Sequence, residues 1–208
     1  MSSGTSSALP PGTPSHRRFG TDVGEPPLFG DPRRWGSLVG LAGGLGFIGY
    51  SPALGAVACV IAWTVGISLV LASLWAHYLH PVSLGPLARP RPLALAAYAM
   101  CVVGELGLIA VGSRTLDAAG RDDLRPALIA AVVGFHFIPF YWAFGERMFL
   151  WLGGVVAMAG AVGLGLGALS VPKAADGTAV IAGLVMLATT TLYALGRFVP
   201  SSVGQPVE

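Results

Sequence analysis

The sequence predicts an all-α integral membrane protein, a bundle of about six transmembrane helices. Apolar residues make up 54% of the chain and charged residues only 11%, whereas a soluble domain carries about 25% charged residues. The mean hydropathy of +0.72 points the same way. In addition, apolar runs recur at lengths near the roughly 20 residues that a helix needs to cross a bilayer core. A soluble protein with an ordinary hydrated surface is therefore excluded.

Breaks in the apolar runs set the expected spans. The stretch from Trp35 to Ala88 contains no Asp, Glu, Lys or Arg and is too long for one span. Tyr50-Ser51-Pro52 supplies the break, because proline lacks a backbone donor and disfavours helix at the preceding residue. Proline-rich or charged turns separate the later runs. The expected spans are about 34–50, 53–78, 93–112, 126–144, 148–169 and 178–196, within a transmembrane domain over residues 35–197.

The two ends of the chain read as tails. Residues 1–34 are rich in Ser, Pro and Gly, so they bury too little apolar surface to offset their ordering entropy and are expected to be disordered. Residues 198–208 form a short C-terminal tail. Placing both tails in the cytoplasm puts eight basic residues inside and four outside, which the positive-inside rule favours. The inside residues are Arg17, Arg18, Arg33, Arg34, Arg89, Arg91, Arg147 and Arg197; the outside ones are Arg114, Arg121, Arg125 and Lys173.

Glu105 is the residue whose position most needs an explanation. It lies near the middle of the third expected span, where a charged carboxylate costs at least about 2.5–3.5 kcal/mol. It must therefore be protonated, paired or hydrated. Either it is a structural acid that locks two helices together, or it carries protons or cations. Tyr98 lies seven residues earlier on the same helix face and could support it.

His136 is the expected partner of Glu105. It lies in the fourth span, which runs antiparallel to the third, so the two side chains could reach similar depths. A Glu–His pair would give both groups a partner and could relay a proton. Pro139 follows His136 closely and would free a backbone carbonyl beside it. The alternative is that His136 is a hydrogen-bonded packing residue.

Two runs of small residues at four-residue spacing predict close helix packing. Small side chains let helix backbones approach, which is the main packing device in lipid. The runs serve internal contacts or, alternatively, the face of a homodimer. They comprise Gly36, Gly40 and Gly44 in the first span and Gly153, Ala157, Ala161 and Gly165 in the fifth.

Other polar residues predict no catalytic, cofactor or metal site. His77 and His80 lie three residues apart beside Trp75 and Tyr78, which favours an aromatic belt with water-facing imidazoles over a metal site. Both cysteines lie in apolar runs, with no Cys/His cluster that could hold zinc. No phosphate loop, nucleophile elbow or dinucleotide fingerprint occurs, and no basic run suggests nucleic acid as a partner. The sequence therefore does not predict an enzyme.

One segment resembles a known group. Gly134-Phe135-His136-Phe137-Ile138-Pro139, followed by Arg147-Met148-Phe149-Leu150-Trp151-Leu152-Gly153, resembles small bacterial multi-pass membrane proteins of unknown function. In these a Gly-x-His-Phe-x-Pro helix precedes a short basic turn. The resemblance implies a compact helical bundle in a bacterial cell membrane and brings no activity or ligand. His136, Pro139 and Arg147 would be the shared positions.

Three hypotheses about function remain open at this stage. The first is an accessory or structural protein that acts through helix packing, with itself as a homo-oligomer or with another membrane protein. The second is a small proton-linked transporter that uses Glu105 with His136. The third is a membrane enzyme, which would need acids and histidines to converge around His77, His80, Glu146 and Arg147.

Overall fold

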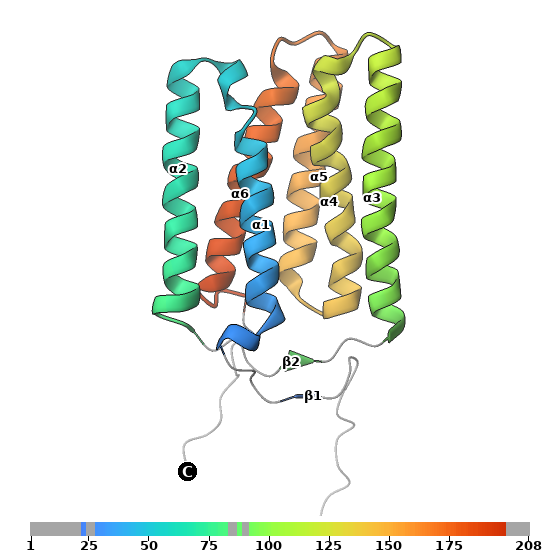
Figure 1. The fold of residues 1–208 in the computed structure, drawn as a ribbon. Helices are drawn as coiled ribbons and strands as arrows, with labels where there is room; N and C mark the ends of the chain where they lie inside the picture. The colour runs from blue at the N-terminus through green and yellow to red at the C-terminus, as the bar shows by residue number, and fades with distance from the viewer. Residues whose placement is uncertain (1–21, 24–27, 83–86, 89–91, 199–208) are drawn as a thin grey trace, which may run out of the picture.

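The computed structural model describes residues 22–23, 28–82, 87–88 and 92–198, and almost all of these residues are helical. Its six long helices are each long and apolar enough to cross a membrane, which confirms the all-α bundle (Figure 1). They are α1 Pro32–Ile48, α2 Ala56–Leu74, α3 Pro92–Ala118, α4 Arg125–Phe144, α5 Arg147–Ala168 and α6 Ala174–Ala194. Most of the predicted tails, 1–34 and 198–208, lies outside the described residues.

Short elements connect the long helices. Three 3-10 turns lie at Leu28–Gly30 (η1), Ser51–Leu54 (η2) and Asp122–Leu124 (η4), and α2 ends in a π-helical turn, η3, at Trp75–Leu79. Two-residue strands β1, Asp22–Val23, and β2, Leu87–Ala88, pair antiparallel with Asp22 opposite Ala88. The first two spans are separate helices, and the Tyr50-Ser51-Pro52 break falls at η2.

Helix boundaries differ from the expected ones where charged residues lie near a helix end. α1 begins at Pro32 because Asp31 caps it, its carboxylate accepting a 2.9 Å hydrogen bond from the Arg33 amide. α3 continues to Ala118, six residues past the expected end at 112. Arg114 and Asp117 are exposed there, so polar side chains extend the helix beyond the apolar run without being buried.

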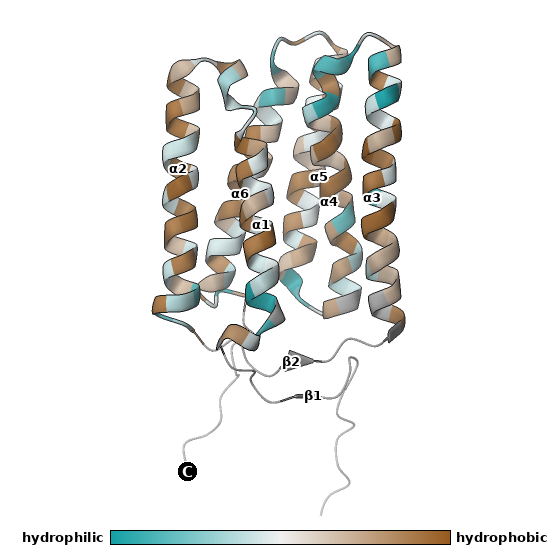
Figure 2. Cartoon of the chain, viewed as in Figure 1, coloured by the Kyte–Doolittle hydropathy of each residue, from teal (hydrophilic) through white to brown (hydrophobic). Residues whose placement is uncertain are grey.

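Helices that follow one another in the chain run antiparallel, and α1 begins at the same end of the bundle at which α6 finishes (Figure 1). α6 is the central helix: it packs on α1, α2, α4 and α5, and 56% of the residues in its apolar 18-residue stretch are buried. α3 is peripheral: it packs mainly on α4, and none of the residues in its apolar 18-residue stretch is buried. Hydrophilic residues gather towards the two ends of the bundle, and the helix walls between them are mostly apolar (Figure 2).

Glycines bring α4 and α5 into backbone contact. A Cβ atom added at Gly134 would lie 2.1 Å from the backbone nitrogen of Ala157, and one added at Gly160 would lie 2.1 Å from that of Ala131. No side chain fits at either position. Small residues therefore hold this helix pair together, as expected for packing in lipid.

The small-residue run predicted for α5 lies only partly in this contact. Gly153 and Ala157 face α4, whereas Ala161 and Gly165 are exposed. A four-residue step turns a helix about 40° beyond one full turn, so three steps rotate it by about 120°. The packed stripe instead continues through Gly160, Gly163 and Gly167.

The small-residue run in α1 also lies only partly in a helix contact, because its residues turn around the helix axis along the run. A Cβ added at Gly44 would lie 2.8 Å from the Leu187 side chain of α6, and one at Gly40 would lie 3.3 Å from Thr190 Oγ1. Gly36 has nothing within 4 Å. Gly40 and Gly44 are thus contacts with α6, and Gly36 is not.

Candidate functional site

The structure brings Glu105 and His136 together between α3 and α4. The Nδ1 atom of His136 lies 3.2 Å from Oε2 of Glu105, and their side chains are 9% and 17% exposed, respectively. The short turn through η4 makes α3 and α4 an antiparallel hairpin, which sets both residues at matching depths. Glu105 therefore has a nearby partner, His136, which carries the opposite charge when it is protonated.

Nδ1 of His136 and Oε2 of Glu105 lie at ion-pair distance, but they do not form an aligned hydrogen bond. His136 Nδ1 is buried and has no partner of hydrogen-bond geometry, and a bond that is poorly aligned contributes little. Attraction between the two groups consequently depends on the charges they carry. Such a pair can hold a proton between two helices or lock them together.

Aromatic rings surround the imidazole. The ring centroid of His136 lies 4.3 Å from that of Phe140, and that of Tyr98 lies 4.7 Å from Phe140. Tyr98 is thus joined to the pair through Phe140. Pro139 lies within α4, which continues through it to Phe144. Arg147 is exposed at the first residue of α5 and is not part of this group.

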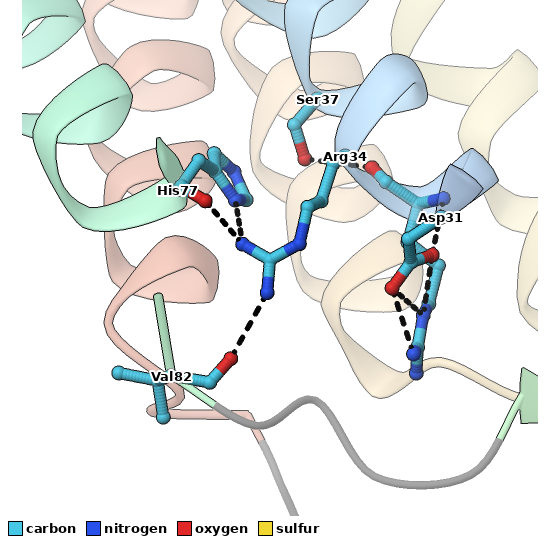
Figure 3. A network of polar contacts seen from close by, with 6 residues as sticks. Asp31, Arg34, Ser37, His77 and Val82 are labelled. Carbon is cyan, nitrogen blue, oxygen red and sulfur yellow. Dashed lines mark hydrogen bonds and ion pairs between the residues drawn. The ribbon is translucent and has the colours of Figure 1, made fainter. Parts of the chain in front are cut away.

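A second polar group lies at the end of the bundle where α1 begins (Figure 3). The Arg34 guanidinium donates from Nη1 to the carbonyl oxygen of His77 at 2.6 Å and from Nη2 to that of Val82 at 3.1 Å. Nη1 also lies 3.4 Å from Nδ1 of His77. His77 is completely buried, so the prediction that its imidazole faces water is wrong. The cause is Arg34, which draws the end of α2 onto α1. His80 is exposed beside Trp75, with ring centroids 4.8 Å apart.

Charged residues from the start of α1 and from the turn before α5, together with Tyr193 of α6, lie beside this group. Arg33 binds the Asp31 carboxylate through Nε and Nη2, at 2.9–3.1 Å. Glu146, between α4 and α5, is hydrogen-bonded to Tyr193 of α6 and lies in the field of Arg33. Burial raises the pKa of Glu146, although Arg33 and the Tyr193 hydrogen bond oppose the shift. These residues join α1, α6 and the turn before α5 at one end of the bundle.

Sequence reasoning did not select Asp31, Arg33 or Arg34, because they precede the first apolar run. A local signal was present: Asp followed by Pro is typical of a helix N-cap and first position. Within the described residues no three His, Cys, Asp or Glu side chains are arranged to hold a metal ion, and Cys59 and Cys101 are not disulfide-bonded. No family model matches the chain, and neither a curated protein nor a solved structure is similar to it.

Proposed function

We propose that this multi-pass membrane protein is an accessory or structural component that acts through helix packing, with a second copy of itself or another membrane protein as its partner. The pairing of Glu105 with His136 supports this proposal, because an internally paired acid is what a helix-locking role requires. The pair leaves the outer face of α3 apolar, with Met100, Val103 and Leu106 exposed.

The observation that carries the proposal is an exposed small-residue stripe on α5. Gly154, Ala161 and Gly165 are exposed, and an added Cβ at either glycine would meet nothing within 4 Å. At about 100° per residue the three lie within about 40° of one another around the helix, with the exposed Met158 on the same face between Gly154 and Ala161. Glycine weakens a helix by about 1 kcal/mol relative to alanine and gives lipid little surface to contact. A second helix, in contrast, can approach such a stripe closely.

Substituting Ala161 tests the stripe. We expect Ala161→Leu to weaken self-association in lipid vesicles at least tenfold, because the larger side chain separates the two helix backbones. The measurement is energy transfer between donor- and acceptor-labelled copies as the protein is diluted with lipid. Val162→Leu is the matched control, since Val162 is the next residue, is exposed and lies about 100° around the helix from Ala161. Equal association of the two variants would contradict the proposal.

The orientation with both termini in the cytoplasm and the location in a bacterial cell membrane are part of the proposal. The orientation is supported by the count of basic residues in the sequence, eight in the segments expected inside and four in those expected outside. Arg33, Arg34, Arg147 and Arg197 flank helix ends at one end of the bundle, and Arg114, Arg121, Arg125 and Lys173 flank helix ends at the other.

A small proton-linked transporter is the second candidate function, and the 3.2 Å approach of His136 to Glu105 is the observation that favours it. In that case Glu105→Gln would abolish proton uptake into vesicles, read with an internal pH-sensitive dye, while leaving the helical content unchanged. Under the packing proposal we expect wild type and Glu105→Gln to take up protons at the same background rate. Uptake by the wild type alone would decide for the transporter.

A further inference from the structure

Four of the five tryptophans lie at the end of the bundle where α1 begins. They lie near the starts of α1 and α5, in η3 and at the end of α4, and each is more than half exposed: Trp35, Trp151, Trp75 and Trp142. The fifth, Trp63, lies within α2. Exposed tryptophan rings near the ends of membrane helices lie at the level of the lipid headgroups. This end of the bundle therefore has an aromatic belt.

Two exposed arginines lie at the same end. Arg147 is the first residue of α5, and Arg197 lies three residues after the end of α6. Their neighbours in the chain meet in one place, because Phe198 packs against the cluster that Met148 forms with Tyr193. The two arginines thus border the contact of α5 with α6, at the level of the aromatic belt.

Neither guanidinium is neutralised by a carboxylate. Within the described residues no ion pair includes Arg147 or Arg197. The carboxylates of the nearby helix ends are engaged elsewhere, since Asp31 is bound by Arg33 and Glu146 is hydrogen-bonded to Tyr193. The positive charge of the two arginines is therefore available to a partner outside the chain.

The charges at the opposite end of the bundle are balanced. Arg121 contacts Asp123, and Arg125 contacts Asp117. Among the residues described at that end, four basic side chains are matched in number by four acids, namely Arg114, Arg121, Arg125 and Lys173 against Asp117, Asp122, Asp123 and Asp176. Exposed positive charge without matching acids is thus a property of the end that carries the tryptophans.

We propose that Arg147 and Arg197 bind the headgroups of anionic phospholipids in the leaflet at which α1 begins. Arg147 and Trp151 are four residues apart, so they share one face of α5. A guanidinium can hold a phosphate through two parallel hydrogen bonds while the indole ring lies at the headgroup level. A zwitterionic headgroup fits less well, because its own cation repels the arginines. An acidic protein segment would not account for the aromatic belt.

The test measures how tightly the purified full-length chain, in micelles of a neutral detergent, binds phosphatidylglycerol and phosphatidylcholine. Each lipid carries a dansyl group on an acyl chain, and binding is read as energy transfer from tryptophan. Each arginine near the headgroups should contribute about fivefold in affinity for an anionic lipid. We expect the wild type to prefer phosphatidylglycerol at least about fivefold, and high salt to weaken this preference.

Arg147→Gln should lower the affinity for phosphatidylglycerol about fivefold and leave that for phosphatidylcholine unchanged. Adding Arg197→Gln should remove the rest of the preference. Arg114→Gln is the matched control, because Arg114 is also exposed but lies at the balanced end, so this variant should bind as the wild type does.

Two results would overturn the proposal. One is equal binding of the two lipids by the wild type, which would leave the arginines to an acidic segment of a partner protein. The other is an equal loss of phosphatidylglycerol binding in Arg147→Gln and Arg114→Gln, which would mean that total charge rather than this surface attracts the lipid.

Discussion

Gly160→Ala is expected to lower the free energy of unfolding by about 3 kcal/mol, at the upper end of the range for overpacked sites. The added methyl group would lie 2.1 Å from the backbone nitrogen of Ala131 and 2.7 Å from the carbonyl oxygen of Ala127. Backbone atoms cannot rotate aside, so α4 and α5 must separate along their whole contact. The measurement is denaturant unfolding in detergent, followed by the far-ultraviolet circular dichroism of the helices.

Gly154→Ala provides the control on the same helix. An added methyl group there meets nothing within 4 Å, and alanine is favoured over glycine in a helix by about 1 kcal/mol. This variant should therefore be as stable as the wild type or slightly more stable. If the two substitutions changed stability equally, α4 and α5 could not be in backbone contact.

The six helices could be predicted from the sequence because apolar runs and prolines are local signals. Tyr50-Ser51-Pro52 separates the first two spans without reference to any other part of the chain. The end of α3 was harder to predict. No helix-breaking residue occurs between 112 and Gly120, and the exposed side chains of Arg114 and Asp117 let the helix continue past its apolar part.

Which face of a helix packs inside is set by partners elsewhere in the chain. The four-residue runs lie in α1 and α5, but Ala161 and Gly165 rotate out of the contact that Gly153 makes with α4. The stripe of α5 that does pack lies along α4, whose own Gly134 faces Ala157 of α5. A spacing rule applied to one helix cannot contain that information.

The two polar contacts, Glu105 with His136 and Arg34 with His77, also differ in how far local sequence predicts them. The meeting of Glu105 with His136 follows from two antiparallel spans joined by a short turn, so the matching depth was predictable although the contact itself was not. Arg34 and His77 are separated by 43 residues, and nothing local relates them. The sequence places Arg34 in the expected N-terminal tail and His77 in an expected aromatic belt. Only the packing of the end of α2 against α1 brings the two side chains together in one buried group.

The contact of Glu105 with His136 should couple their contributions to stability by about 1–3 kcal/mol, the range for groups in direct contact. The double-mutant cycle combines Glu105→Gln, His136→Ala and both together, each measured by unfolding in detergent. His136→Ala alone should be the most harmful, because it leaves the acid inside the membrane without its partner, at a cost of about 2.5–3.5 kcal/mol. The double variant should recover part of that loss, since no lone acid remains.

Arg121 and Asp123 form a control pair at the same separation. Their Nε and Oδ1 atoms are 3.2 Å apart, but the side chains are 36% and 61% exposed, so water screens them and their coupling should stay below about 1 kcal/mol. Larger coupling in the inner pair would mean that the acid serves to hold α3 on α4. Equal, weak coupling in both pairs would mean that water reaches Glu105, and this would favour the transporter over helix packing.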